Sequence, residues 1–189
     1  MKRALGAVVF FLAGGLYAQQ AGMQNAWDIR QTLAAIATHA DRLAPLLDQV
    51  HPESWIASGA PEAYVAQAKS CRVQLKAVAT DARNLSRNPE KLTDTLQILF
   101  RIRTLESLLG SLSEGIRKYH NPAMADLLNA AIAENGTNRD RLQQYALELA
   151  TAKEQEFRVA DEEAQRCRES ISRQPSRERT APPKPERNQ

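Results

Sequence analysis

The sequence predicts an all-α fold: an up-and-down helical bundle with coiled-coil-like seams and a long helical hairpin. The chain is rich in Ala, Leu, Gln, Glu and Arg, which favour helices, whereas valine and aromatic residues are sparse. Apolar residues recur at alternating steps of three and four, which places them on one face of a helix. No run of alternating apolar and polar residues indicates a strand.

The first predicted helix covers residues 27–50. Its seam follows steps of three and four and consists of Ala26, Ile29, Leu33, Ile36, Ala40, Leu43, Leu47 and Val50. Pro45 removes one backbone donor inside this run, but the seam keeps its register, so we expect a kink rather than a break. A connection follows, in which His51-Pro52 and Gly59 are stop signals.

The second and third predicted helices cover 61–87 and 89–119, separated by an Asn88 cap and Pro89. The second seam is Tyr64, Ala68, Cys71, Leu75, Val78, Ala82 and Leu85, and the third is Ile98, Ile102, Leu105, Leu109, Leu112, Ile116 and Tyr119. Gly110 and Gly115 lie off the third seam. Each marks either a close helix approach or a weak point in the helix.

The fourth predicted helix covers 122–134, after the cap-and-proline signal Asn121-Pro122. Asn135-Gly136 suits a left-handed turn, and the last helix then covers 138–171. That helix begins on the seam Leu142, Tyr145 and Leu149 and ends on the seam Phe157, Ala160, Ala164, Cys167 and Ile171. The two registers are joined by a four-residue slip near Lys153.

The N-terminus has the pattern of a secretory signal peptide. Lys2 and Arg3 precede the apolar run 4–16, and a small residue at Ala18 offers a cleavage site before Gln19. The run is too short to cross a bilayer as a lasting helix, so no transmembrane segment is expected after cleavage. We therefore divide the chain into a signal peptide (1–18), a linker (19–26), a bundle domain (27–171) and a disordered basic Pro-rich tail (172–189). Localisation is expected to be periplasmic or secreted, in a bacterium.

The net charge of +3 arises outside the predicted domain. Without the signal peptide and the tail, the body has a net charge of −2. A nucleic-acid surface needs a basic stripe on the folded part, so no nucleic-acid partner is expected. The basic tail could make weak, salt-sensitive contact with an anionic surface.

Cys71 and Cys167 both lie on apolar seams, and cysteines of an exported chain usually pair. If the 89–119 helix continues end to end into the next helix, both cysteines lie about 24 Å from the Asn88 turn. This layout predicts an intramolecular disulfide worth roughly 4 kcal/mol. Folding back at Asn121 would separate them. Alternatives are a bond between two copies of the chain, or two buried thiols.

The same layout places the tip of a helical hairpin at residues 134–138. Met124, Leu128 and Leu142 lie near that tip and are the candidate interaction residues, unless they simply pack on one another. Whether the tip projects or folds back is left open.

No catalytic, cofactor or metal site is predicted. The three histidines lack the spacing of metal ligands, neither cysteine belongs to a haem attachment motif, and no Gly-x-Ser-x-Gly elbow is present. We therefore expect a non-enzymatic interaction, scaffold or chaperone-like protein of the cell envelope, whose partner is another envelope protein or a second copy of itself. The alternative is a four-helix bundle that binds a small ligand or cofactor.

Overall fold

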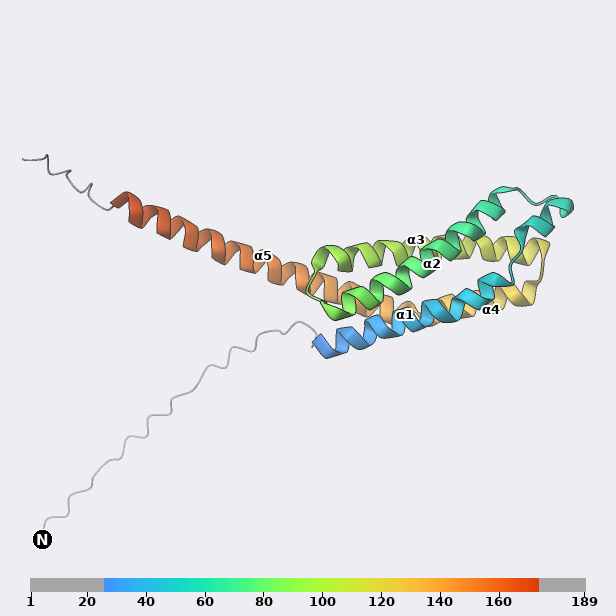
Figure 1. The fold of residues 1–189 in the computed structure, drawn as a ribbon, viewed down its shortest axis with the longest axis horizontal. Coiled ribbons are helices and arrows are strands. Elements are labelled where there is room, and N and C mark those ends of the chain that lie inside the picture. The colour runs from blue at the N-terminus through green and yellow to red at the C-terminus, as the bar shows by residue number, and fades with distance from the viewer. Residues whose placement is uncertain (1–25, 174–189) are drawn as a thin grey trace, which may run out of the picture.

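A computed structural model describes residues 26–173 (Figure 1). They form five α-helices and one short 3-10 helix: α1 (Ala26–Asp48), η1 (Pro52–Ser58), α2 (Ala63–Arg87), α3 (Leu92–Tyr119), α4 (Pro122–Glu134) and α5 (Gly136–Arg173). No strand occurs in this range. The predicted all-α bundle is therefore confirmed. Within residues 26–173, none of the helices is both long and apolar enough to cross a membrane.

The bundle is an antiparallel four-helix arrangement. α1, α2 and α3 alternate in direction, and α4 together with the first half of α5 takes the place of the fourth helix (Figure 1). α1 packs on α2 and α5, and α3 packs on α2, α4 and α5, so each of the four contacts two neighbours. Their buried seam residues share one core. This is how seams of period three and four bury their apolar faces.

α1 continues through Pro45 to Asp48, so the expectation that the proline does not break the helix is confirmed. The last carbonyls of a helix have no partner in a following turn, so they need donors from elsewhere. Arg72 of α2 supplies them, and its guanidinium donates to the oxygens of Leu47 (2.9 Å) and Val50 (2.7 Å). Gly59 then ends η1 in the left-handed conformation, with a φ of 82°.

The chain reverses between α3 and α4. Asn121 caps α4, and its side-chain oxygen accepts a hydrogen bond from the Ala123 amide at 2.9 Å. Pro122 occupies the first turn of α4, as its missing amide hydrogen favours. Ser113 of α3 donates to the Ala125 carbonyl (3.3 Å), which ties the two helices together. The layout in which α3 runs end to end into α4 is therefore wrong, and the chain folds back at Asn121.

No reversal occurs between α4 and α5, which run in the same direction (Figure 1). The Arg139 amide donates to the Asn135 carbonyl at 3.0 Å, so a helical hydrogen bond bridges the junction. Gly59 is the single residue of positive φ in the described part, so Gly136 is not left-handed. The turn predicted at Asn135-Gly136 is therefore wrong, and the long hairpin has its bend at residues 120–121 instead.

An aromatic cluster closes the end of the bundle opposite the α2–α3 turn. Trp55 of η1 is buried, and its ring lies edge-on to Tyr64 at 5.9 Å and stacks on Tyr119 at 6.5 Å and on His120 at 6.2 Å, measured between ring centroids. The Tyr64 ring covers Gly115 so closely that a Cβ there would lie 2.6 Å from it. Gly115 therefore permits a close approach, whereas Gly110 has open space around it.

Candidate functional site

The most unusual surface belongs to the end of α5. Residues 154–173, which we call the C-terminal rod, are all exposed, whereas Leu142, Tyr145 and Leu149 earlier in the same helix are buried. The rod leaves the bundle beside the start of α1 and projects beyond it (Figure 1). Its twenty residues span about 30 Å at 1.5 Å per residue.

The rod is supported by its own side chains. Ion pairs one turn apart join Arg166 to Glu162 (3.9 Å) and Arg173 to Glu169 (3.4 Å). The Arg168 guanidinium also donates to the carbonyl of Ala164, four residues earlier (3.4 Å). Such pairs stabilise a helix by a few tenths of a kcal/mol each. They help to stabilise a helix that packs against no other element of the described chain.

The first half of α5 anchors the rod to the bundle. The buried Tyr145 hydroxyl donates to the Pro89 carbonyl in the α2–α3 turn at 3.0 Å, and burial raises the pKa of Tyr145. This bond fixes the level at which α5 leaves the bundle. The neutral hydroxyl that donates is thus also the form that its surroundings favour.

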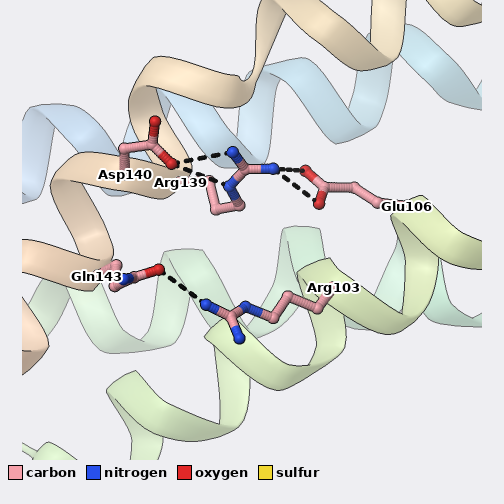
Figure 2. Close-up of polar contacts among 5 residues, drawn as sticks. All are labelled: Arg103, Glu106, Arg139, Asp140 and Gln143. Carbon is pink, nitrogen blue, oxygen red and sulfur yellow. Dashed lines mark hydrogen bonds and ion pairs between the residues drawn. The ribbon is translucent and has the colours of Figure 1, made fainter.

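A second anchor is a row of polar contacts between α3 and α5 (Figure 2). The Arg139 guanidinium binds both oxygens of Glu106, at 3.2 and 3.0 Å, and also contacts one oxygen of Asp140 at 2.9 Å. Hydrogen bonds to Asp140 and Glu106 raise the pKa of Arg139. One turn away, Arg103 donates to Gln143 at 2.8 Å. Hydrogen bonds between charged groups are stronger than neutral ones, so the Arg139–Glu106 contact helps to hold α5 against α3.

Beneath this row lies a small interior cavity. His39, Glu106 and Asn135 provide its polar lining, and aliphatic side chains of α1, α2, α3 and α4 provide the rest. Burial lowers the pKa of His39, and the positive charge of Arg42 adds to the effect, so both favour the neutral ring. The cavity has a volume of about 20 Å³, which suits one water molecule rather than a ligand.

The predicted disulfide is wrong. Cys71 and Cys167 are both free, Cys71 is fully buried and Cys167 is exposed, and they are not within bonding distance. The physical reason is the reversal at Asn121. Because α4 runs back along α3, α5 begins closer to the α2–α3 turn than the end-to-end layout assumed, and its end passes beyond that turn. Cys167 follows Tyr145 by 22 residues and so lies about 33 Å past the α2–α3 turn, outside the bundle.

The two thiols should therefore differ sharply in reactivity. Burial raises the pKa of Cys71 to about 11, and the thiolate is the reactive form. At low micromolar concentration and neutral pH, we expect a disulfide reagent to titrate one thiol rapidly in the native chain and the second only after unfolding. Peptide mapping should identify the rapid one as Cys167. Two rapidly reacting thiols would contradict the burial of Cys71. The absence of any rapidly reacting thiol would contradict the exposure of Cys167.

The candidate tip residues lie elsewhere than predicted. Leu128 and Leu142 are buried in the core, and Met124 is half-buried and packs against it. They therefore contribute to packing, as the alternative interpretation held, and they offer no projecting surface. Ala18, Gln19 and the tail from residue 174 onward lie outside the described residues.

The histidines do not gather into a site. His39 lies in α1, His51 before η1 and His120 after α3, and among residues 26–173 no three His, Cys, Asp or Glu side chains are placed to hold a metal ion.

Sequence reasoning missed the division of charge along the C-terminal rod. Residues 154–163 carry a net charge of −4, and residues 164–173 carry +2. We call these segments the acidic half and the basic half. Counting charges along the last predicted helix would have revealed the division, but the rod's exposure depended on the fold.

A second surface missed from the sequence is a shallow groove between α2 and α3. Its volume is about 490 Å³, and the exposed apolar side chains of Leu96 and Phe100 lie along it, one helical turn apart.

Comparison with known protein families, curated proteins and solved structures finds no match to this chain, so its surfaces must be interpreted from their own chemistry.

Proposed function

We propose that this chain is an exported, non-catalytic interaction protein of the bacterial cell envelope, a scaffold or chaperone-like protein, that offers its C-terminal rod to a protein partner. The single observation that carries this proposal is the rod itself, a helix of twenty exposed residues anchored rigidly to a compact bundle. A helix that packs on no other element of residues 26–173 is suited to pairing with another helix.

The rod presents a stripe that another helix could recognise. Its seam consists of Phe157, Ala160, Ala164, Cys167 and Ile171, at steps of three and four, and all five residues are exposed. We call this stripe the rod seam. Helices pair along such seams by inserting side chains between those of the partner. Phe157 and Ile171 are 76% and 65% exposed, so the apolar stripe is available to a partner.

Export is proposed from the N-terminal pattern. The positive start at Lys2 and Arg3, the apolar run and the small residue at Ala18 support delivery across the inner membrane. The tail could add weak contact with an anionic surface, and a chain without residues 174–189 would then lose only salt-sensitive envelope association.

Photo-crosslinking in the producing bacterium tests this function. A photoreactive phenylalanine analogue at Phe157 lies in the rod seam, and the same analogue at Val159 lies on another face of the same helix. We expect crosslinked protein from position 157 and much less from position 159, in the envelope fraction. The purified product should begin at Gln19. Equal adducts from both positions, or none from either, would remove the support for a binding rod.

A truncation provides the structural control. A chain that ends at Lys153 lacks the whole rod, yet none of the described residues that it loses, 154–173, is buried. Its unfolding free energy should therefore stay within about 0.5 kcal/mol of the full chain, as is usual for changes at exposed sites. Its capture of the partner should disappear.

A further inference from the structure

The direction in which the rod seam faces limits what can cover it. With 3.6 residues per turn, the seam lies about 45° around the helix from the stripe formed by Leu142, Tyr145 and Leu149, which faces the core. The two stripes are joined by the four-residue slip near Lys153, and both lie on the same side of a straight helix. A helix seated on the seam would thus lie in line with the bundle, just beyond its end.

This position decides the orientation that a second copy can take. A parallel copy would place its own bundle alongside the first half of α5, where α1 and α3 already pack. An antiparallel copy would place its bundle beyond Arg173, where the rod ends and nothing in the described chain lies. Space therefore permits the antiparallel arrangement alone.

Charge leads to the same orientation independently. In a parallel pair, the acidic half would face the acidic half of the other copy, at −4 against −4. In an antiparallel pair, each acidic half faces a basic half, at −4 against +2. Charges that flank a helical seam determine partner choice and orientation in paired helices.

We propose that the C-terminal rod pairs with the rod of a second copy of this chain, antiparallel and seam against seam. The inference rests on the proposed function and names the partner of the same surface. Three of the five seam residues are Ala or Cys, so the apolar area is small and the pair is weak and reversible.

Sedimentation equilibrium on the reduced, purified chain tests the pairing over micromolar to millimolar concentrations. Phe157→Glu and Val159→Glu add the same charge to the same exposed helix, but only the first change lies in the seam. We expect a monomer–dimer equilibrium for the wild type and for Val159→Glu. Phe157→Glu should weaken dimerisation at least tenfold. Both variants should keep the wild-type unfolding midpoint, because neither position is buried.

Cys167 provides a second readout because it lies in the seam. The rate at which it reacts with a disulfide reagent should fall as the wild-type concentration rises, and it should stay constant for Phe157→Glu. A nitroxide at Gln155, in a Cys167→Ser chain, reports orientation. Antiparallel pairing about the middle of the rod offsets the two labels by about 26 Å along the helix axes, whereas parallel pairing places them at the same level, separated only by the width of the pair.

Several outcomes would overturn the proposal: a wild type that stays monomeric at millimolar concentration, a dimer that Phe157→Glu leaves intact, or labels at Gln155 that lie close together. These outcomes are distinguishable from failure of the proposed function. If position 157 crosslinks to a different protein in the envelope while the purified chain stays monomeric, the rod is a binding surface but its partner is not a second copy. If the purified chain dimerises through the rod seam but position 157 crosslinks to no other protein in the envelope, the self-pairing is supported and a different protein partner is not.

Discussion

Trp55→Ala is expected to lower the free energy of unfolding by about 3–5 kcal/mol, the usual cost of removing a large buried aromatic side chain. Trp55 is 2% exposed and contacts three aromatic rings, those of Tyr64, Tyr119 and His120. These rings come from α2 and from the end of α3. The substitution would leave a void between the connection after α1, the start of α2 and the α3–α4 reversal.

The neighbouring residue provides the control. Ile56 belongs to the same short helix but is 41% exposed, so Ile56→Ala should cost only a small part of that amount. Urea unfolding followed by far-UV circular dichroism measures both. If Trp55→Ala lay within about 1 kcal/mol of the wild type, or if Ile56→Ala cost as much, the aromatic cluster would not close the bundle as described.

The second large effect is a change in the free energy of unfolding that has opposite signs when two glycines of α3 are replaced by alanine. Gly110→Ala should stabilise the chain by up to about 1 kcal/mol, because alanine favours helix and nothing lies within 4 Å of the added methyl group. Gly115→Ala should destabilise it by about 1–3 kcal/mol, because the methyl group would lie 2.6 Å from the Tyr64 ring. That ring is held between Trp55 and Tyr119 at 5.9 and 6.0 Å and has little room to move.

Urea unfolding of both alanine variants under identical conditions measures this difference. The same substitution in the same helix gives a matched pair, so helix propensity cancels and the contact with Tyr64 remains. Stabilisation by both substitutions would contradict the close approach at Gly115. In that case Gly115 would be only a weak point in α3, which was the other interpretation of the sequence.

The helices of this protein could be predicted from its sequence because each buries one periodic stripe. The 122–134 helix has the predicted bounds, and α1 runs through Pro45 as expected, because seam packing outweighs one missing backbone bond. The seam residue Cys71 is buried as its spacing indicates. These are local properties, and they depend on spacing rather than on how the helices are connected.

The connection between helices could not be predicted in the same way. Two similar signals, Asn121-Pro122 and Asn135-Gly136, lie at the ends of α4, and the reversal was expected at the wrong one. Asn121 has both a side-chain cap and a proline after it, so the chain breaks there. Gly136 is compatible with ordinary helical angles, and helical hydrogen bonding continues across it. The cysteine pairing and the hairpin tip depended on that choice and were wrong with it.

The C-terminal rod shows the same limit in another form. Its seam was visible in the sequence, but a seam does not say whether its own chain covers it. Cys167 and Ile171 lie on a stripe that resembles a core stripe, yet both are exposed because α5 extends beyond the end of the bundle. Only the level of Tyr145, fixed by its bond to Pro89, reveals how much of α5 projects.

One distance tests most directly whether the C-terminal rod projects from the bundle. Nitroxides at Cys167 and at a Lys76→Cys position on α2 can be measured by pulsed electron resonance, diluted with unlabelled chain so that only intramolecular pairs contribute. Lys76 lies twelve residues before the Asn88 turn, and Cys167 lies 22 residues beyond Tyr145 on the other side of it. A projecting rod predicts a distance near about 50 Å. A distance centred below about 30 Å would mean that α5 folds back along the bundle, which would contradict an uncovered rod.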